Sequence, residues 1–185
     1  MKRYLSVWFP DWPLTRLRRA RRRLAGKPYR QKRAHEDAPE PPRKPFVLVE
    51  EGAAGLRIAA ANASARQLGI SPGLGFTDAR ARCPDLLHED IDRKSDREAL
   101  EKIAHWMIRL SPLVALDGED ALMIETTGCD HLHGGEPAMM KAVSALLGRD
   151  DIPHQLGLAS TPGAASAIAR AWPGHILAYG EEAKG

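Results

Sequence analysis

The sequence has few cysteines and no long hydrophobic run. Only Cys83 and Cys129 occur among 185 residues, whereas a small secreted domain held by disulfides usually carries four or more. We therefore expect two reduced thiols in a reducing compartment. No apolar stretch approaches the ~20 residues that a membrane-spanning helix needs, and residues 1–10 are too short and too aromatic for a signal peptide. These absences predict a cytoplasmic protein with no membrane partner.

Charge is nearly balanced overall but unevenly placed. The formal net charge is only +3, and 43% of the residues are hydrophobic, which is enough for the core of one domain, or of one domain with a small insert. Cations crowd one short stretch: Arg16, Arg18, Arg19, Arg21, Arg22, Arg23, Lys27, Arg30, Lys32 and Arg33. Such a cluster can bind a polyanion by releasing its counterions. The alternative is a solvated basic loop without a partner.

Hydrophobic patterning predicts a mixture of strands and helices. The expected strands are residues 2–9, 46–50, 56–60, 113–116, 121–126 and 155–159. The expected helices are residues 11–25, 96–110, 136–147 and 160–172, with two short helices beginning near Asn62 and Thr77. Residues 34–45 are rich in proline and charge and should form a linker. This order predicts an α+β fold in which helices cover one face of a sheet.

Three segments in order resemble the Y-family DNA polymerases. Residues 57–74 (RIAAANASARQLGISPGL) are similar to the fingers segment with its YEAR helix and FGV turn. Residues 120–129 (DALMIETTGC) resemble the DEAFCDLTG element of UmuC-like polymerases, and residues 157–169 (GLASTPGAASAIA) are similar to GVAPTKTLAKIA. The agreement extends across residues 3–180. Within the family, residues 8–10, 111–118 and 127–135 look most like the ImuB-type accessory branch.

The resemblance implies a ferredoxin-like palm with a small inserted fingers subdomain. The palm would comprise residues 1–15 and 96–180, the basic and proline-rich insert residues 16–45, and the fingers residues 46–95. The thumb, the little finger and the clamp-binding segment of the family would lie beyond Gly185. The sequence is therefore expected to be a fragment in which the thumb and little-finger regions are absent.

The resemblance also implies a degenerate catalytic site. Two-metal nucleotidyl transfer requires acidic ligands around a pair of Mg²⁺ ions. The family's three carboxylate positions fall on Trp8, Asp120 and Ala121. Neither an indole nor a methyl group binds Mg²⁺, so Asp120 is interpreted as vestigial. We expect no catalytic residue, no metal site and no cofactor.

The positions that contact the nucleotide in the family have also lost most of their charged side chains in this sequence. The YEAR tyrosine and arginine fall on Ala63 and Arg66, and the two lysines of KTLAK fall on Pro162 and Ser166. A triphosphate would thus meet one cation instead of three. The segment 129–133 contains Cys, Asp and two His, but all lie within five residues. Zinc sites usually draw ligands from two separated pairs, so this segment is interpreted as a structural loop.

The predicted function is that of a non-catalytic DNA-binding adaptor in SOS-induced, error-prone translesion synthesis and DNA repair. The resemblance implies as partners DNA, a RecA-like accessory protein, an error-prone replicative-type polymerase and the sliding clamp. The residues expected to contact DNA phosphates are Arg16, Arg18, Arg19, Arg21, Arg22, Arg23, Lys27 and Arg30, with Arg66 as a lesser candidate. Two alternatives stay open: an active Y-family polymerase with a rearranged metal site, and an interaction domain that does not bind DNA.

Overall fold

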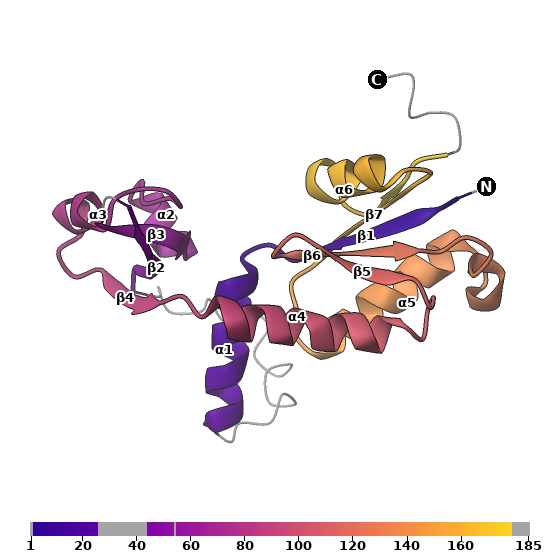
Figure 1. Ribbon diagram of the computed structural model, residues 1–185, viewed down its shortest axis with the longest axis horizontal. Coiled ribbons are helices and arrows are strands. Elements are labelled where there is room, and N and C mark those ends of the chain that lie inside the picture. The colour runs from indigo at the N-terminus through magenta and orange to yellow at the C-terminus, as the bar shows by residue number, and fades with distance from the viewer. Residues whose placement is uncertain (1, 26–43, 54, 179–185) are drawn as a thin grey trace, which may run out of the picture. The chain divides into compact units, whose positions relative to one another are not determined.

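The chain forms two compact units in the computed structural model (Figure 1). The structure describes residues 2–25, 44–53 and 55–178. Unit 1 comprises Met1–Trp12 and Lys94–Gly185, and unit 2 comprises Pro13–Arg93. None of the helices in these described ranges is long and apolar enough to cross a membrane.

Unit 1 is built on a five-stranded sheet in the order β5-β6-β1-β7-β8. Its strands are β1 (Tyr4–Trp8), β5 (Val114–Asp117), β6 (Ala121–Glu125), β7 (Gln155–Ala159) and β8 (His175–Ile176). The central strand β1 pairs antiparallel with both β6 and β7. The aromatic and β-branched residues of β1 favour extended backbone, and Pro10 cannot continue the ladder because it has no N–H to donate.

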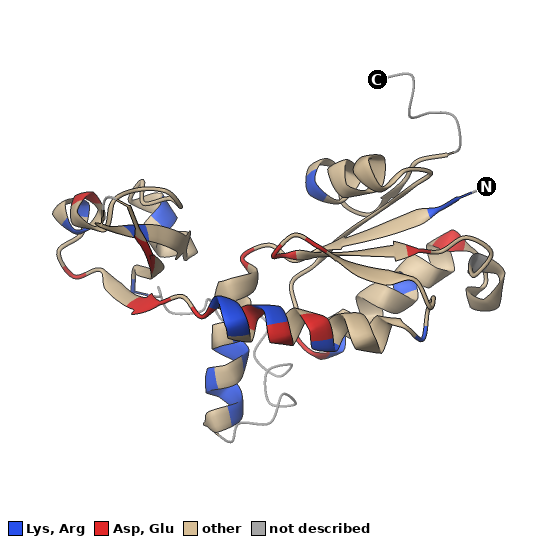
Figure 2. Cartoon of the chain, viewed as in Figure 1, with Lys and Arg blue, Asp and Glu red and all other residues tan. Residues whose placement is uncertain are grey.

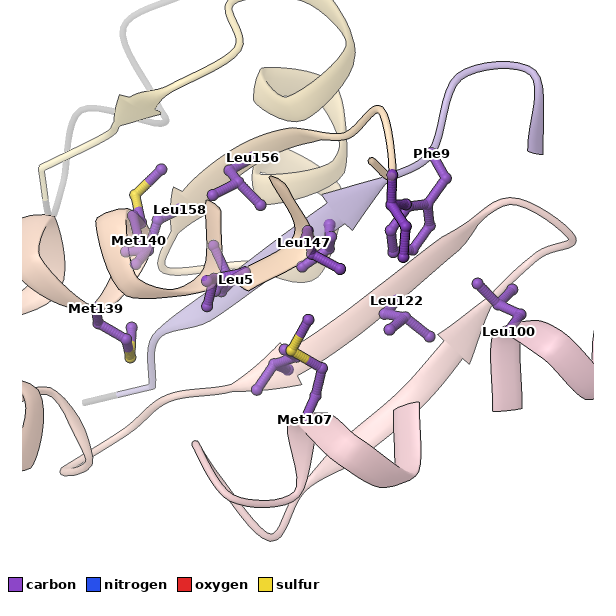
Figure 3. Close-up of a cluster of buried hydrophobic side chains, with 14 of the residues drawn as sticks. Leu5, Phe9, Leu100, Met107, Leu122, Met139, Met140, Leu147, Leu156 and Leu158 are labelled. Atoms are coloured by element: carbon purple, nitrogen blue, oxygen red, sulfur yellow. The ribbon is translucent and has the colours of Figure 1, made fainter. Parts of the chain in front are cut away.

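One face of this sheet carries the main hydrophobic core (Figure 3). Alternate strand residues such as Leu5, Leu122 and Leu158 are fully buried against α4 (Arg93–Met107) and α5 (Glu136–Arg149). Leu100 and Met107 reach this core from α4, as the helical spacing predicted. Burial of each large side chain contributes about 1.5–3 kcal/mol, so this face holds unit 1 together.

The opposite face is covered by α6 (Pro162–Ala171), which corrects the expectation that all helices lie on one face (Figure 1). Ala165 and Ile168 of α6 pack with Ala159 of β7. Gly157 permits this packing, because a Cβ there would lie 2.4 Å from the Ala169 nitrogen and 2.5 Å from the Ala165 oxygen. Only a residue without a side chain lets this helix approach the strand so closely.

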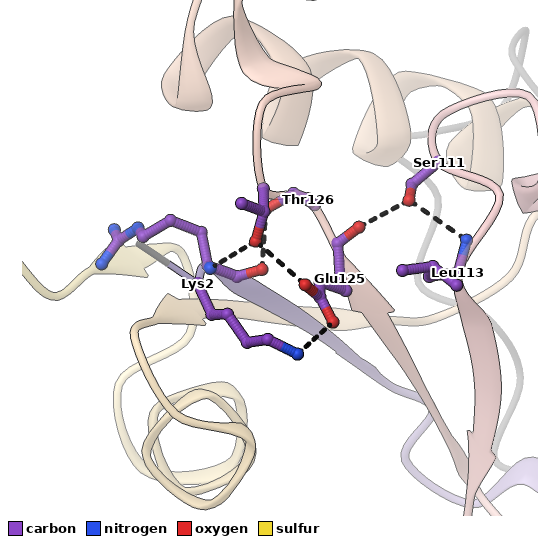
Figure 4. A network of polar contacts seen from close by, with 7 residues as sticks. Lys2, Ser111, Leu113, Glu125 and Thr126 are labelled. Atoms are coloured by element: carbon purple, nitrogen blue, oxygen red, sulfur yellow. Dashed lines mark hydrogen bonds and ion pairs between the residues drawn. The ribbon is translucent and has the colours of Figure 1, made fainter.

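Hydrogen bonds and an ion pair connect the residues at the start of β1 with those at the end of β6 (Figure 4). The Thr126 amide donates to the Arg3 carbonyl at 2.8 Å, and Ser111 Oγ donates to the Glu125 carbonyl. Lys2 Nζ lies 3.3 Å from the Glu125 carboxylate. The hydrogen bond and charge of Glu125 raise the pKa of Lys2 above its ordinary value of 10.5. This exposed pair therefore favours folding below that pH and loses its effect as the pH rises through the raised pKa.

Unit 2 contains a three-stranded sheet in the order β3-β2-β4. Its elements are α1 (Trp12–Leu24, whose first residue belongs to unit 1), β2 (Phe46–Gly52), β3 (Gly55–Ala61), α2 (Ala63–Gln67), α3 (Phe76–Arg82) and β4 (Leu87–Asp90). Val47, Ile58 and Ile70 are fully buried in its core. As expected, the Asn62 side chain caps α2 by accepting from the Ala65 amide at 2.9 Å.

Candidate functional site

The candidate site lies where β1 ends and β6 begins. Trp8 is directly opposite Ala121 across the two strands. Asp120 is the last residue of the turn before β6, and its carbonyl accepts from the Phe9 amide at 2.8 Å. The Trp8 indole Nε1 donates to Asp120 Oδ2, also at 2.8 Å. The turn and the strand pairing therefore bring together the three residues on which the sequence analysis focused.

A cation from α6 joins them. The Arg170 guanidinium lies 3.5 Å from Asp120 Oδ1, and its central carbon lies 5.4 Å from the centre of the Trp8 ring. Asp120 can thus accept from the indole with one oxygen while the other faces the guanidinium. The Arg170 and Asp120 side chains are 39% and 40% exposed, so solvent screens their attraction.

A serine and a second carboxylate extend the contacts. Arg170 Nη1 donates to Ser166 Oγ, one helical turn earlier on α6. Ser166 Oγ in turn donates to Asp117 Oδ2 at 3.3 Å, at the end of β5. Trp8, Asp117, Asp120, Ser166 and Arg170 are called the Arg170 cluster below.

The Arg170 cluster combines two carboxylates with one guanidinium. Ala121, next to Asp120, is fully buried and offers no ligand atom. In the described ranges no three His, Cys, Asp or Glu side chains are arranged to hold a metal ion. This includes the segment 129–133, whose last four residues form a short 3-10 helix. The described geometry therefore shows a polar cluster in which one guanidinium offsets part of the charge of two carboxylates.

The second group of predicted residues lies on α1, whose cations are all arginine (Figure 2). Arg21 and Arg23 are exposed, whereas Arg16, Arg18, Arg19 and Arg22 are half-buried. Arg21 forms an ion pair with Glu89 and lies 5.4 Å over the Phe46 ring. Lys27 and Arg30 lie outside the described residues. The helix therefore presents a dense row of cations, some of them engaged within unit 2.

Arg66 stands on a different element from the α1 arginines. It lies in the last turn of α2 and is exposed.

Sequence reasoning missed Arg170 and Asp117 as members of the cluster. Arg170 is fifty residues after Asp120, so no local motif joins them. A partial signal was present: Ser166 and Arg170 are four residues apart, and this spacing places side chains on one face of a helix. The missing information was that α6 covers the sheet face to which Trp8 belongs.

Comparisons with known proteins agree on one family. The family model described as impB/mucB/samB matches residues 32–172, more than half of the chain. Protein ImuB from Caulobacter vibrioides is 44% identical over 111 residues, covering 60% of this chain and 24% of that protein. DNA polymerase IV from Dehalococcoides mccartyi is 31% identical over 103 residues, covering 55% of this chain and 26% of that protein. The chain spans about a quarter of the length of these curated relatives.

Solved structures share the fold. A post-insertion binary complex of Dbh DNA polymerase matches with a TM-score of 0.70 at 15% identity, covering 96% of this chain and 48% of that chain. DinB from Sulfolobus solfataricus matches with a TM-score of 0.66 at 16% identity, covering 94% and 47%. These likenesses confirm the expected α+β fold, a polymerase palm with a small inserted fingers subdomain.

Proposed function

The chain belongs to the impB/mucB/samB family. We propose that it is a DNA-binding, non-catalytic part of a translesion-synthesis accessory protein. The observation that carries the proposal is the contact of Asp120 with the Trp8 indole and the Arg170 guanidinium. A working polymerase would need that carboxylate to hold Mg²⁺.

Coordination chemistry supports the non-catalytic part. In this proposal Trp8, Asp120 and Ala121 stand at the three carboxylate positions of the active relatives, so two of the three acidic ligands are missing. Mg²⁺ needs oxygen ligands in near-octahedral geometry. The Arg170 guanidinium, 3.5 Å from Asp120, also places a positive charge beside the one acidic ligand that remains.

Charge repulsion opposes metal binding as well. Two unit charges about 4 Å apart interact with roughly 1 kcal/mol in water and 4 kcal/mol near a protein surface, and the interaction doubles for a divalent ion. The guanidinium therefore weakens the attraction of Asp120 for Mg²⁺. It also offsets part of the carboxylate charge that a metal pair would otherwise neutralise.

The DNA-binding part rests on α1. Its row of arginines suits contacts with backbone phosphates, which are salt-dependent and carry no sequence information. The α1 arginines are the proposed main contacts, with Arg66 as a lesser one. Arg16, Arg19 and Arg23 are chosen for the test below because their spacing of three and four residues places them on one face of the helix. By analogy with the ImuB-type branch, the whole protein would work beside a RecA-like accessory protein, an error-prone replicative-type polymerase and the sliding clamp.

A gel-shift assay with a primer–template tests the DNA-binding part. We expect the purified chain to retard the DNA, and the triple variant Arg16→Gln, Arg19→Gln, Arg23→Gln to retard it much less. No retardation by the purified chain would instead favour an interaction domain that does not bind DNA, and equal retardation by both proteins would contradict the assignment of DNA binding to α1.

An active polymerase is the second candidate, because Asp117 and Asp120 keep two carboxylates in the Arg170 cluster. Primer extension with Mg²⁺ and all four dNTPs tests it, and our proposal predicts no added nucleotide. Extension that disappears in Asp120→Asn would establish the polymerase instead. A catalytically active relative tested on the same primer–template serves as the positive control.

A further inference from the structure

Unit 2 contains a pocket of about 460 Å³ that is separate from the Arg170 cluster. Arg21 of α1, Phe46 of β2, Arg80 of α3 and the segment Leu86–Glu89 line it. Its volume falls in the range of pockets that bind small ligands. Every lining residue belongs to Pro13–Arg93, so the pocket lies within one compact unit.

The charged groups of the pocket favour an anion. Two arginines and one glutamate line it, and Glu89 is already paired with Arg21. Arg80 Nη2 donates to the Pro84 carbonyl at 3.3 Å, which fixes its side chain without neutralising its charge. A guanidinium has five N–H donors in a planar fork that matches phosphate oxygens. A phosphate can therefore bind Arg80 and compete with Glu89 for Arg21.

The remaining walls favour a planar apolar group beside that anion. Phe46 and the side chain of Leu87, 48% exposed, contribute apolar surface. The His88 ring is tilted against Phe76, with ring centres 4.5 Å apart. Arg80 lies 6.0 Å over the same Phe76 ring, which lies behind His88 and Arg80 and does not itself line the pocket. Among the lining residues, Arg21 lies 5.4 Å over the Phe46 ring, so a cation and an aromatic ring are neighbours in the wall. Nucleobases stack on aromatic rings and guanidinium planes in such surroundings.

We propose that this pocket binds a nucleoside phosphate, supplied either as a free nucleotide or as one unit of single-stranded DNA. An inorganic anion alone would leave the apolar wall unused, and an uncharged ring alone would leave Arg80 unused. A nucleoside phosphate uses both. The site does not depend on the Arg170 cluster and goes beyond the proposed contacts of α1 with duplex phosphates.

An NMR titration of the purified chain tests the site. Deoxythymidine monophosphate, a short oligo-dT and inorganic phosphate are added in separate titrations, and backbone amide shifts are followed. We expect saturable shifts confined to Leu86–Glu89 and the neighbouring ends of β2 and α3, with inorganic phosphate binding more weakly. Shifts with the mononucleotide identify a free nucleotide as a sufficient ligand. Shifts with oligo-dT alone identify single-stranded DNA.

Matched variants on α3 provide the control. Arg80→Gln should weaken nucleotide binding about tenfold, because a hydrogen bond to a charged group is lost, and Arg80→Lys should recover part of it. Arg82→Gln should bind as the parent does, because Arg82 donates to the Gly69 carbonyl and does not line the pocket. Amide spectra of each variant report whether unit 2 is still folded.

Three outcomes would overturn the proposal: no saturable shift with either nucleotide probe, equal binding of inorganic phosphate and mononucleotide, or equal weakening by Arg80→Gln and Arg82→Gln. The gel-shift assay on the primer–template with the Arg16, Arg19 and Arg23 variant is read separately. A pocket that does not bind nucleotides can therefore be distinguished from a chain that does not bind DNA through α1.

Discussion

At the scale of single residues, guanidinium groups determine much of the polar structure of unit 1. Arg170 bridges the Asp120 carboxylate and the Ser166 hydroxyl while its plane lies over Trp8. Arg3 donates from Nε and Nη2 to the two oxygens of Glu136, at 2.6 and 2.9 Å. The two pairs differ in exposure, because the Arg3 side chain is only 16% exposed. Their energetic weights should differ accordingly.

We expect Arg3→Lys to lower the free energy of unfolding by about 1–3 kcal/mol, because lysine keeps the charge but loses the two-pronged bond to Glu136. Arg3 Nη1 also donates to the Leu177 carbonyl at 3.0 Å, and this bond is lost too. Urea unfolding of both proteins measures the difference. Arg97→Lys is the matched control, since Arg97 and Glu101 form an exposed pair. A loss in Arg3→Lys no larger than in the control would contradict this assignment.

Arg170→Met should cost less than about 1 kcal/mol, because the pair with Asp120 is partly exposed and screened by water. The methionine stem preserves much of the contact with Trp8. Urea unfolding again gives the value. A loss well above this range would mean that the Arg170 cluster is a major source of stability. That result would weaken the interpretation that the cluster is a partly exposed group of polar side chains at the position of the family's metal site.

At the scale of elements, the close contact of α6 with β7 decides which face of the sheet holds the Arg170 cluster. The sequence predicted both elements from the cap at Thr161, Pro162 and the apolar strand before them. The expectation that all helices cover one face was wrong for α6, because a glycine in a strand has several possible causes and only the fold shows that a helix occupies the space. The strands β4 and β8 were missed because β4 is exposed throughout and β8 has only two residues.

Gly157→Ala should destabilise unit 1 by about 1–3 kcal/mol or more, because the new methyl group meets the backbone of α6. Gly163→Ala is the matched control on α6: nothing lies within 4 Å of its added Cβ, and alanine favours a helix by up to about 1 kcal/mol. Thermal unfolding compares the two. If Gly157→Ala were as harmless as Gly163→Ala, the packing assigned to α6 would be wrong.

At the scale of the whole molecule, the chain joins a unit with a partly compensated polar cluster to a unit with a basic helix. The sequence predicted the helices from different signals: α4 from apolar residues at helical spacing, α1 from Asp11 and Pro13 at its start, and α2 from the cap at Asn62. The resemblance assigned Trp8, Asp120 and Ala121 to one site, and the strand pairing places Trp8 opposite Ala121. Arg170 could not be found in this way, because its distant partners Trp8 and Asp120 come from two segments that only the folded sheet brings together.

The arginines of α1 should give DNA binding a steep dependence on salt. Each lost phosphate contact lowers the slope of log K against log salt by about 0.9, so the Arg16, Arg19 and Arg23 triple variant should lower it by up to about 2.7. A salt series of fluorescence-anisotropy titrations measures the slope. Lys94→Gln, Arg97→Gln and Lys102→Gln together form the control on α4, which carries acidic residues as well. An equal change in both triple variants would contradict a specific role for α1.

Binding of Mn²⁺ in place of Mg²⁺ measures whether Asp120 can hold a metal ion, because paramagnetic broadening of amide signals locates the ion. We expect no saturable broadening around Asp120 in the parent chain, because two of the three carboxylates are missing. It predicts saturable broadening when Trp8→Asp and Ala121→Glu supply the two missing carboxylates. Saturable broadening around Asp120 in the parent chain, abolished by Asp120→Asn, would contradict the account.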